Sequence, residues 1–577
     1  MLKDDCTVWR AWLGVGSAVL LPVPSVWAQP SLPVLETSPI PRELPPVQPD
    51  PGHALPVVRE VEREGKLPKL SLSIKSVSFA GADAFPLSLL NEIAKDIAHR
   101  RVTLAVLEQT RLAVVRLYRE HGFLLSTVSM AIDRDANVHF VVTEGYIASV
   151  RLGHDIGPAG TKVLALLEHL VDRRPLANAE MERWLLLAQQ VAGVKLRAVL
   201  QNANREPGAL TLIADVSRQA VSAMISADNR GYENTGPEEG LVVAHFNSFT
   251  ALGERTDLVY YHTDGNTDNF GQLSENIFIG SSGLQFHAYG GMGRAVPSGV
   301  LREIDYHSQV VSFGGSLDYP VLLGRRKALT TRLSLDGRDV AISVGRTGLS
   351  QDSMRVARAN ASYAWQDLWF GSTRVGTSTV DITGSQGLPF MGSSANGRAA
   401  PPGGRNNARF DFRKISLSVS RTQALFMPWQ GALVALRGAA GGQYTPSILP
   451  TAEEFYLGGQ SFTRGYYSGQ VAGDKAAYAT AELQLNTTAS IDVFQRNIDV
   501  TSQVYGFYDW GQAWSNQVGG ANPRLASAGV GVKVGVGHNF QMQGEFVHRL
   551  ATEVEYEGLG AQSLGHTMFY WGATVFY

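Results

Sequence analysis

Strict alternation of apolar and polar residues dominates the chain after Ala220. Short segments with an apolar residue at every second place follow one another, separated by Gly, Asn, Asp and Ser turns. The clearest of them lie at 329–336, 414–420, 477–486 and 529–536. One apolar and one polar face, repeated many times, is the signature of a transmembrane β-barrel, with apolar residues toward lipid and polar residues toward a lumen. Residues 220–577 provide for about sixteen such strands.

Two soluble folds, a β-sandwich and a secreted β-solenoid, also produce alternation. Three features favour the barrel instead. The polar face carries Lys, Arg, Glu and Gln with little apolar relief, as a water-filled lumen would. Aromatic residues cluster near predicted strand ends, where membrane interfaces lie. The last predicted strand, 568–577, alternates and ends in aromatic residues. No apolar run after the N-terminus is long enough for a helix to span a bilayer, so embedding would be by strands.

The segment before the barrel mixes strands and helices. In residues 71–145, an alternating strand over 72–79 precedes two helical patterns and then two strands over 123–132 and 138–142. The same order of strand, helix, helix, strand, strand recurs in residues 146–219. Two consecutive units with one topology form an internal repeat, which indicates an array of like modules.

The N-terminal part is predicted to be processed and extended. Residues 1–28 have the basic and apolar regions of a secretory signal peptide, with cleavage expected after Ala28. A membrane anchor is the alternative, but the apolar run over 11–23 is shorter than the roughly 20 residues that a spanning helix needs. Residues 29–70 are proline-rich and predict a semi-rigid linker, with a possible short helix over 57–64.

Composition narrows the range of functions. The net charge of −2 gives no reason to expect nucleic acid as a partner. Cys6 is the single cysteine, so neither a disulfide within the chain nor a thiolate metal site can form. The thirteen histidines are scattered, and no catalytic or phosphate-binding motif occurs. We therefore expect no catalytic residues, no metal and no cofactor.

A Gly-rich stretch, 457–466, interrupts the alternation. Its three glycines cannot pack as a strand core, whereas Phe462 and Tyr466 need a surface to lie against. Arg464 is the only charged residue of the stretch. A second stretch, Phe507–Gly511, alternates so that Phe507, Asp509 and Gly511 share one face. That face is predicted to point into the lumen, where Gly511 would leave room for a loop backbone.

These motifs resemble those of the two-partner secretion family of outer-membrane transporters, of the haemolysin/haemagglutinin activator and secretion type. The family belongs to the superfamily in which periplasmic POTRA (polypeptide-transport-associated) domains precede a 16-stranded barrel. Residues 118–123 resemble the helix end of a POTRA domain, and Asp228–Gly231 resembles the turn after the first barrel strand. Thr463–Tyr466 resembles the Val-Arg-Gly-Tyr signature of the long sixth extracellular loop, with Thr in place of Val. Phe507–Gly511 fits the Phe-x-Asp-x-Gly signature of the barrel wall.

The resemblance and the alternation together suggest a latch. The loop, about 446–476, would fold into the barrel so that Arg464 meets Asp509. Phe462, Gly465 and Tyr466 would lie beside this pair, against the wall residues Phe507 and Gly511. Without the resemblance, each charge taken alone is more simply explained as a solvated lumen residue.

The POTRA resemblance also implies a client site. An extended peptide could add to an exposed sheet edge beside the second helix of each unit. The candidate residues are Phe123, Leu125 and Val128 in the first unit, and Val194 and Leu196 in the second. The alternative is that these strands only complete their own sheets, and the sequence does not distinguish the two.

The implied function is secretion of one large partner exoprotein, adhesin-like or haemolysin-like, through the barrel. The protein would be a monomer in the cell outer membrane, in contact with lipid, with its POTRA units in the periplasm. The barrel-assembly machinery would recognise its C-terminal strand, which ends at Tyr577. Two alternatives stay open: an assembly factor for other barrels, which usually has three or more POTRA units, and a solute porin. Many family members also begin with a plug helix, for which only 57–64 is a candidate.

Overall fold

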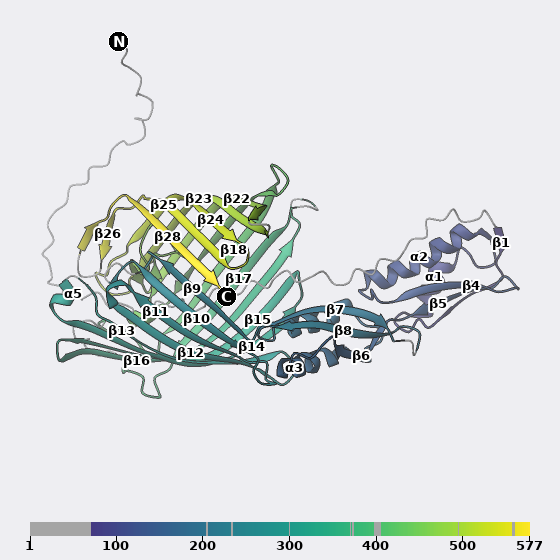
Figure 1. The fold of residues 1–577 in the computed structure, drawn as a ribbon, viewed down its shortest axis with the longest axis horizontal. Helices are drawn as coiled ribbons and strands as arrows, with labels where there is room; N and C mark the ends of the chain where they lie inside the picture. Colours follow the sequence, from purple (N-terminus) through teal and green to yellow (C-terminus); the bar gives the residue numbers. More distant parts are fainter. Residues whose placement is uncertain are drawn as a thin grey trace, which may run out of the picture.

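The computed structural model describes most of the chain after the linker. The signal peptide, the linker and the helix expected over 57–64 lie outside the described residues. The described residues are 71–203, 206–231, 235–298, 300–369, 371, 374–396, 405–493, 496–556 and 560–577. They form two small α+β units, which extend from one end of a large barrel (Figure 1).

The first unit packs two helices on a three-stranded sheet of order β2-β5-β4. β5 pairs in parallel with β2 and antiparallel with β4. The apolar stripes of both helices face this sheet, so Leu90, Leu107 and Tyr118 are buried with Phe140. The elements are β1 (Ser71–Ser73), β2 (Val77–Ala80), α1 (Leu87–Ala94), β3 (Arg101–Thr103), α2 (Leu104–Glu120), β4 (Thr127–Ile132) and β5 (Val138–Thr143).

Two strand predictions for this unit were wrong in extent. The strand expected over 72–79 is two strands, because the chain changes partners: β1 pairs with β3, and β2 pairs with β5. Alternation reports which face is buried but not which strand lies alongside. The strand expected from Phe123 begins only at Thr127, because residues 121–125 form turns that follow α2.

The second unit repeats the topology, with sheet order β6-β8-β7, which confirms the predicted internal repeat. Again the central strand pairs in parallel with the first strand and antiparallel with the other. Val163, Leu166 and Leu212 are fully buried between helices and sheet. The elements are β6 (Tyr146–Leu152), α3 (Pro158–Leu167), the 3-10 helix η1 (Glu168–Leu170), α4 (Asn178–Gln189), β7 (Val194–Asn202) and β8 (Ala209–Arg218).

Sixteen strands close into an antiparallel barrel among the described residues, as predicted. Neighbours in the chain are neighbours in the barrel, and β28 pairs with β9 to close it. The strands are β9 (Val221–Asp228), β10 (Glu239–Asn247), β11 (Arg255–Thr263), β12 (Asp268–Ile279), β13 (Leu284–Ala295), β14 (Tyr306–Leu323), β15 (Lys327–Val344), β16 (Thr347–Asp367), β17 (Gly376–Gly387), β18 (Arg413–Phe426), β19 (Ala432–Tyr444), β22 (Lys475–Val493), β23 (Arg496–Trp514), β24 (Arg524–Val536), β25 (Phe540–Arg549) and β28 (Thr567–Phe576).

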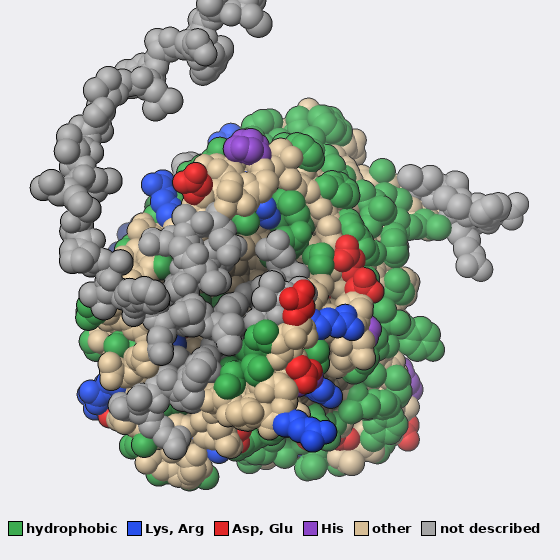
Figure 2. Space-filling view, turned by 90° about the vertical axis from the view of Figure 1, so that its left-hand side faces the viewer, with side chains coloured by type: hydrophobic (Ala, Val, Ile, Leu, Met, Phe, Trp, Pro, Cys, Tyr) green, Lys and Arg blue, Asp and Glu red, His purple; other side chains and the backbone are tan. Residues whose placement is uncertain are grey.

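Side chains alternate between the two faces of the wall. Leu335, Leu417 and Val530 are exposed on the outside, at 63%, 46% and 60%. The residues that flank them in sequence, such as Ser334, Asp336, Ser416 and Ser418, face the lumen. Figure 2, which looks onto the end far from the α+β units, shows charged side chains of both signs on that end. Hydrophobic side chains gather along the sides of the barrel, where lipid would lie.

Connection lengths differ between the two ends of the barrel. β9 follows the second unit directly and runs away from it. The first connection between barrel strands, and every second connection after it, therefore lies at the end far from the α+β units. The two longest of them run between β17 and β18 and between β19 and β22. Short elements decorate these far-end connections: η3 (Asp264–Asn266), α5 (Val300–Glu303), η4 (Thr451–Glu453), β20 (Phe455–Leu457), β21 (Val471–Gly473), β26 (Glu553–Tyr556) and β27 (Gly560–Ser563).

The second unit is docked on the near end of the barrel. The Lys162 Nζ donates to the carbonyl of Gly280 at 3.1 Å, and Glu182 accepts from the backbone N–H of Arg325 at 2.7 Å. Phe278 at the end of β12 joins the buried core of the unit. Burial lowers the pKa of Lys162. These contacts fix the second unit beside the barrel opening.

Candidate functional site

The connection between β19 and β22 folds back into the barrel. Its short strands β20 and β21 pair antiparallel and form the neck of a hairpin. We call residues 458–470 the tip and the rest of the connection, 445–457 and 471–474, the base. Gly458 and Gly459 leave the neck with φ of +112° and +81°, a backbone conformation that suits glycine. The tip carries the Gly-rich motif predicted from the sequence.

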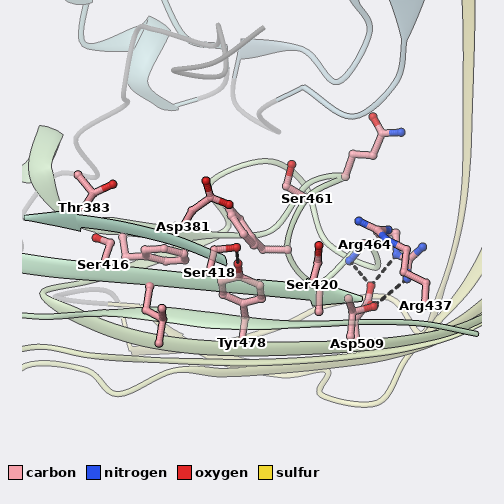
Figure 3. Close-up of a pocket in the computed structure, with 17 residues that line it drawn as sticks. Asp381, Thr383, Ser416, Ser418, Ser420, Arg437, Ser461, Arg464, Tyr478 and Asp509 are labelled. Carbon is pink, nitrogen blue, oxygen red and sulfur yellow. Dashed lines mark hydrogen bonds and ion pairs between the residues drawn. The ribbon is translucent and has the colours of Figure 1, made fainter. Parts of the chain in front are cut away.

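Arg464 of the tip lies against the inner wall and forms an ion pair with Asp509 (Figure 3). Its Nε and Nη2 donate to the two carboxylate oxygens of Asp509, each at 2.9 Å. Its backbone N–H donates to the same carboxylate at 2.9 Å. Bidentate, charge-assisted hydrogen bonds of this kind are among the strongest that side chains make. The guanidinium also lies 3.6 Å from the centre of the Phe507 ring, within range of a cation–π interaction.

Two further wall groups complete the environment of Arg464. Glu482 forms an ion pair with Nη1, and Thr480 Oγ1 accepts from Nη2 at 3.0 Å. The register of β22 on β23 places Thr480 opposite Asp509 and Glu482 opposite Phe507. Alternation had placed Glu482 on the lumen face, but its pairing with Arg464 was not predicted, because it depends on the path of the loop.

Gly511 has a different role from the one expected. A Cβ atom at this position would lie 2.9 Å from Cγ2 of Thr463, and 3.2 Å from the side chain of Leu457. Gly511 therefore admits side chains of the loop rather than its backbone. Gly465 is the position of close backbone approach, since a Cβ there would lie 2.6 Å from the Cβ of Ser527. Thr463 adopts φ of +57°, which is rare for a β-branched residue and indicates strain at the tip.

The two aromatic residues of the motif anchor opposite sides of the tip. The Phe462 ring packs against Tyr478 of β22 at 4.5 Å between ring centres. Tyr466 is fully buried, and its hydroxyl lies within hydrogen-bonding distance of the carbonyls of Ala526 and Ala551, at 2.8 and 2.7 Å. The tip is thus fixed to several strands of the wall.

Three buried charged residues around the tip were not predicted from the sequence: Arg230, Glu545 and Arg549. Arg230 pairs with Glu545 and donates to the carbonyl of Arg464 at 3.2 Å. Arg549 donates to the carbonyl of Gly465 at 2.6 Å. The turn motif Asp228–Gly231 had pointed to Arg230, but no sequence signal connected it with the loop.

With these residues, three arginines face three carboxylates, and none of the six is more than 7% exposed. Arg464 pairs with Asp509 and Glu482, and Arg230 pairs with Glu545, so the loss of one partner would leave a buried charge without its counter-charge. Arg549 donates to the backbone carbonyls of Gly465 and Gly565. We call these six residues the tip cluster: Arg230, Arg464, Arg549, Glu482, Asp509 and Glu545.

A second set of ion pairs holds the base of the loop. Glu453 accepts from Arg358 at 2.7 Å and from Lys414 at 2.8 Å. Asp474, which is fully buried, accepts from both Nη atoms of Arg405, at 2.6 and 3.1 Å. Arg405 belongs to the connection between β17 and β18. The base is therefore fixed both to the wall and to its neighbouring connection.

The residues predicted to bind client do not lie on an open surface. Phe123 and Leu125 precede β4, and Leu125 packs against the core of the second unit. Val128, Val194 and Leu196 lie on β4 and β7, with side chains 5–8% exposed. Their side chains complete the cores of the two units. The strands themselves, β4 and β7, are edge strands of their sheets, so Val128, Val194 and Leu196 can offer a partner only their backbone groups.

The described part of the chain contains no group of three or more His, Cys, Asp or Glu residues that could hold a metal ion. Across the same residues, no helix has the length and apolar character needed to cross a membrane.

Two α+β units and a sixteen-stranded barrel with a folded-in loop define an outer-membrane transporter with periplasmic POTRA domains. Residues 211–534 match the family described as haemolysin secretion/activation protein ShlB/FhaC/HecB, and residues 72–145 match its ShlB-type POTRA domain. The chain belongs to this family. It is a two-partner secretion transporter, whose barrel lies in the outer membrane and whose family transports partner exoproteins.

Solved structures share the fold. CdiB from Escherichia coli superposes with a TM-score of 0.68 at 16% identity, covering 91% of this chain and 94% of that one. CdiB from Acinetobacter baumannii gives a TM-score of 0.59 at 16% identity, covering 88% and 90%. No curated protein matches the sequence. At this identity, the two structures support the fold alone.

Proposed function

We propose that this transporter exports one large adhesin-like or haemolysin-like exoprotein, and that the tip cluster keeps its channel competent. Unfolded client binds the POTRA units and threads the lumen, and folding outside draws it forward. The observation that carries the proposal is the pair of hydrogen bonds from Nε and Nη2 of Arg464 to the carboxylate oxygens of Asp509, each at 2.9 Å. It holds the tip against the wall formed by β22 to β25 and so keeps the rest of the lumen clear.

The energetics favour a tip that stays docked. Removing one partner of a buried ion pair costs about 3–5 kcal/mol, because the other charge stays buried. An undocked tip would leave Asp509 and Glu482, which are diagonal neighbours on paired strands, without the cation of Arg464. The free tip would then occupy the space that a client needs.

Client capture is proposed to use the outward backbone groups of β4 and β7. Gly193 and Ala203, which flank β7, bond to Gln219 and Ala209. The even-numbered residues of β7, such as Ala198 and Leu200, therefore point their N–H and C=O away from β8. In both units a side chain of the second helix occupies one outward carbonyl. Arg111 donates to Val128 at 2.9 Å, and Gln189 to Leu196 at 3.2 Å. The helices thus limit the part of each edge that a client strand can use.

This capture step is testable with a backbone substitution. Ala198→Pro removes one outward N–H, and proline is tolerated on a sheet edge, so the unit should fold while export falls. Ala198→Ser keeps the N–H and serves as the matched control. Equal export by both variants would refute capture along β7.

The proposed function is tested by secretion. Cells with and without the chain are compared for proteins in the medium, and one large protein should depend on it. Arg464→Ala and Asp509→Ala should insert as heat-modifiable barrels, yet secrete much less of that protein. Normal secretion by both variants would rule out the latch. If no secreted protein depends on the chain, the export proposal fails.

Three finer points belong to this proposal. The transporter acts as a monomer without catalytic residues or a cofactor, since threading needs only binding and folding free energy. The barrel-assembly machinery recognises β28, the strand ending next to Tyr577. A truncation of β28 should therefore lower the amount of inserted barrel before it affects export per barrel.

A further inference from the structure

A cavity of about 530 Å³ remains in the lumen beside the docked tip (Figure 3). One side of it is the tip itself, including Phe462 and Arg464. The other side is formed by β17, β18 and β19, where Asp381, Ser418, Ala439 and the cation Arg437 line it, and by Tyr478 and Thr480 of β22. A cavity of this size admits an extended segment of a few residues but no folded domain.

The strand register shows what the β17–β19 side presents. Thr383, Ser416 and Gln443 lie side by side across the three strands, as do Asp381, Ser418 and Gly441, and Thr379, Ser420 and Ala439. Ile382, Leu417 and Val419, which alternate with them, are exposed on the outside, so these nine residues face the lumen. We call them the hydroxyl wall. Five of the nine carry a hydroxyl group, and Asp381 is the one charged residue among them.

The hydrogen bonds that the hydroxyl wall makes are with neutral groups. Thr383 accepts from Asn360 at 2.9 Å, and Gln443 donates to the backbone carbonyls of Glu453 and Asp474 at 3.2 and 3.1 Å. Thr379 and Ser420 share a hydrogen bond of 2.6 Å, and the Tyr478 hydroxyl donates to Ser418 at 3.1 Å. Each hydroxyl can donate and accept, which suits a backbone whose N–H and C=O groups pass in succession. Weak, repeated contacts let a chain enter and also leave.

The neighbouring parts of the lumen offer a different surface. On β14 to β16, lumen-facing arginines are paired across strands with aspartates: Arg332 with Asp318 at 2.6 Å, and Arg358 with Asp336 at 3.0 Å. On β22 to β25, the tip cluster occupies the wall. A passing backbone would have to compete with ion pairs on both of these surfaces.

We propose that the exported chain passes in extended form along the hydroxyl wall, opposite the docked tip. The partner that this surface fits is an unfolded segment rich in small, uncharged polar residues. This inference rests on the proposed function, and it adds which side of the lumen the client uses.

The test uses single cysteines in full-length protein carrying Cys6→Ser, which removes the single native cysteine. Ser418→Cys probes the hydroxyl wall. Ser334→Cys is the matched control: it is a half-buried lumen serine of β15, hydrogen-bonded to Asp336 at 2.9 Å. The probe is an unstructured peptide of Gly, Ser, Thr and Asn with one activated cysteine. A small methanethiosulfonate reagent, applied separately, measures how accessible each lumen cysteine is.

After correction for accessibility, the peptide should form a disulfide about tenfold faster at Ser418→Cys than at Ser334→Cys. Equal rates, or a faster reaction at Ser334→Cys, would overturn the inference. The experiment needs no client, so it is independent of the secretion test. Export without the peptide preference refutes the hydroxyl wall alone, and preference without any exported protein refutes the proposed function alone.

Discussion

The tip and the base of the folded-in loop are held by the same kind of contact with opposite polarity. At the tip, the loop supplies the cation, Arg464, and the wall supplies Asp509 and Glu482. At the base, the loop supplies the carboxylates of Glu453 and Asp474, and the cations come from the barrel and from the neighbouring connection.

The difference lies in how many points hold each part. The base is paired with Arg358, Lys414 and Arg405, which come from three separate elements. The tip carries a single charged side chain, Arg464, and the other charged groups that hold it, Arg230 and Arg549, donate to its backbone carbonyls. Glycines at the neck, Gly458 and Gly459, separate the two parts. The comparison teaches that the base is a fixed frame, whereas the tip is the part whose position one substitution can change.

The largest effect is expected at the base. Asp474→Ala removes a fully buried carboxylate that accepts from Arg405 and from the backbone N–H groups of Leu449 and Asn516. Unfolding should become about 3–5 kcal/mol easier, measured as the denaturant midpoint of the purified barrel. Asp411→Ala, which breaks an exposed pair with Arg409, is the control and should change little. An unchanged midpoint for Asp474→Ala would contradict the fixed frame.

A smaller effect is expected from Arg464→Lys. Lysine keeps the charge but cannot form the two-pronged contact with Asp509, so docking of the tip should weaken by about 1.5–3 kcal/mol. Export should fall between that of the native protein and that of Arg464→Ala, while the denaturant midpoint changes less than in Asp474→Ala. Export equal to that of Arg464→Ala would show that charge alone is not sufficient, and native export would show that geometry is not needed.

The smallest effect is expected from Gly511→Ala. The added methyl group meets Thr463 at 2.9 Å, and such overpacking costs about 1–2 kcal/mol. Export should fall modestly with the barrel intact. Gly384→Ala on β17 is the matched control, because nothing lies within 4 Å of the added atom. Equal export by the two variants would mean that the tip does not press on this wall.

The tip was predicted from local rules together with the resemblance of its motifs to those of the family. Alternation places Asp509 in the lumen whatever the rest of the chain does, and the Gly-rich motif with Arg464 marks a loop that cannot be a strand. The ion pairs that hold the base were not predicted from the sequence. Arg405 and Asp474 are 69 residues apart in the chain, and neither lies in a motif, so only the packing of two long connections brings them together.

The same distinction explains the POTRA units. The helical and strand periodicities of the sequence predicted the repeated topology, because each shows which face of a helix or strand is buried. They did not show that Leu125 leaves the first unit and packs against the second. A buried apolar residue looks the same in sequence whichever core it joins, which is why the client-binding residues were placed on side chains that prove to be core.

The most direct test of the account fixes the tip where the structure has it. Gln460 of the tip donates to Gln543 of β25 at 3.2 Å, and neither belongs to the tip cluster. Both are changed to cysteine with Cys6→Ser and bridged by a short reversible thiol cross-linker, and export is measured before and after reduction. We predict that the bridged transporter exports normally and that bridging restores export to Arg464→Ala. Loss of export on bridging, recovered on reduction, would show that the tip must leave the wall and would contradict the account.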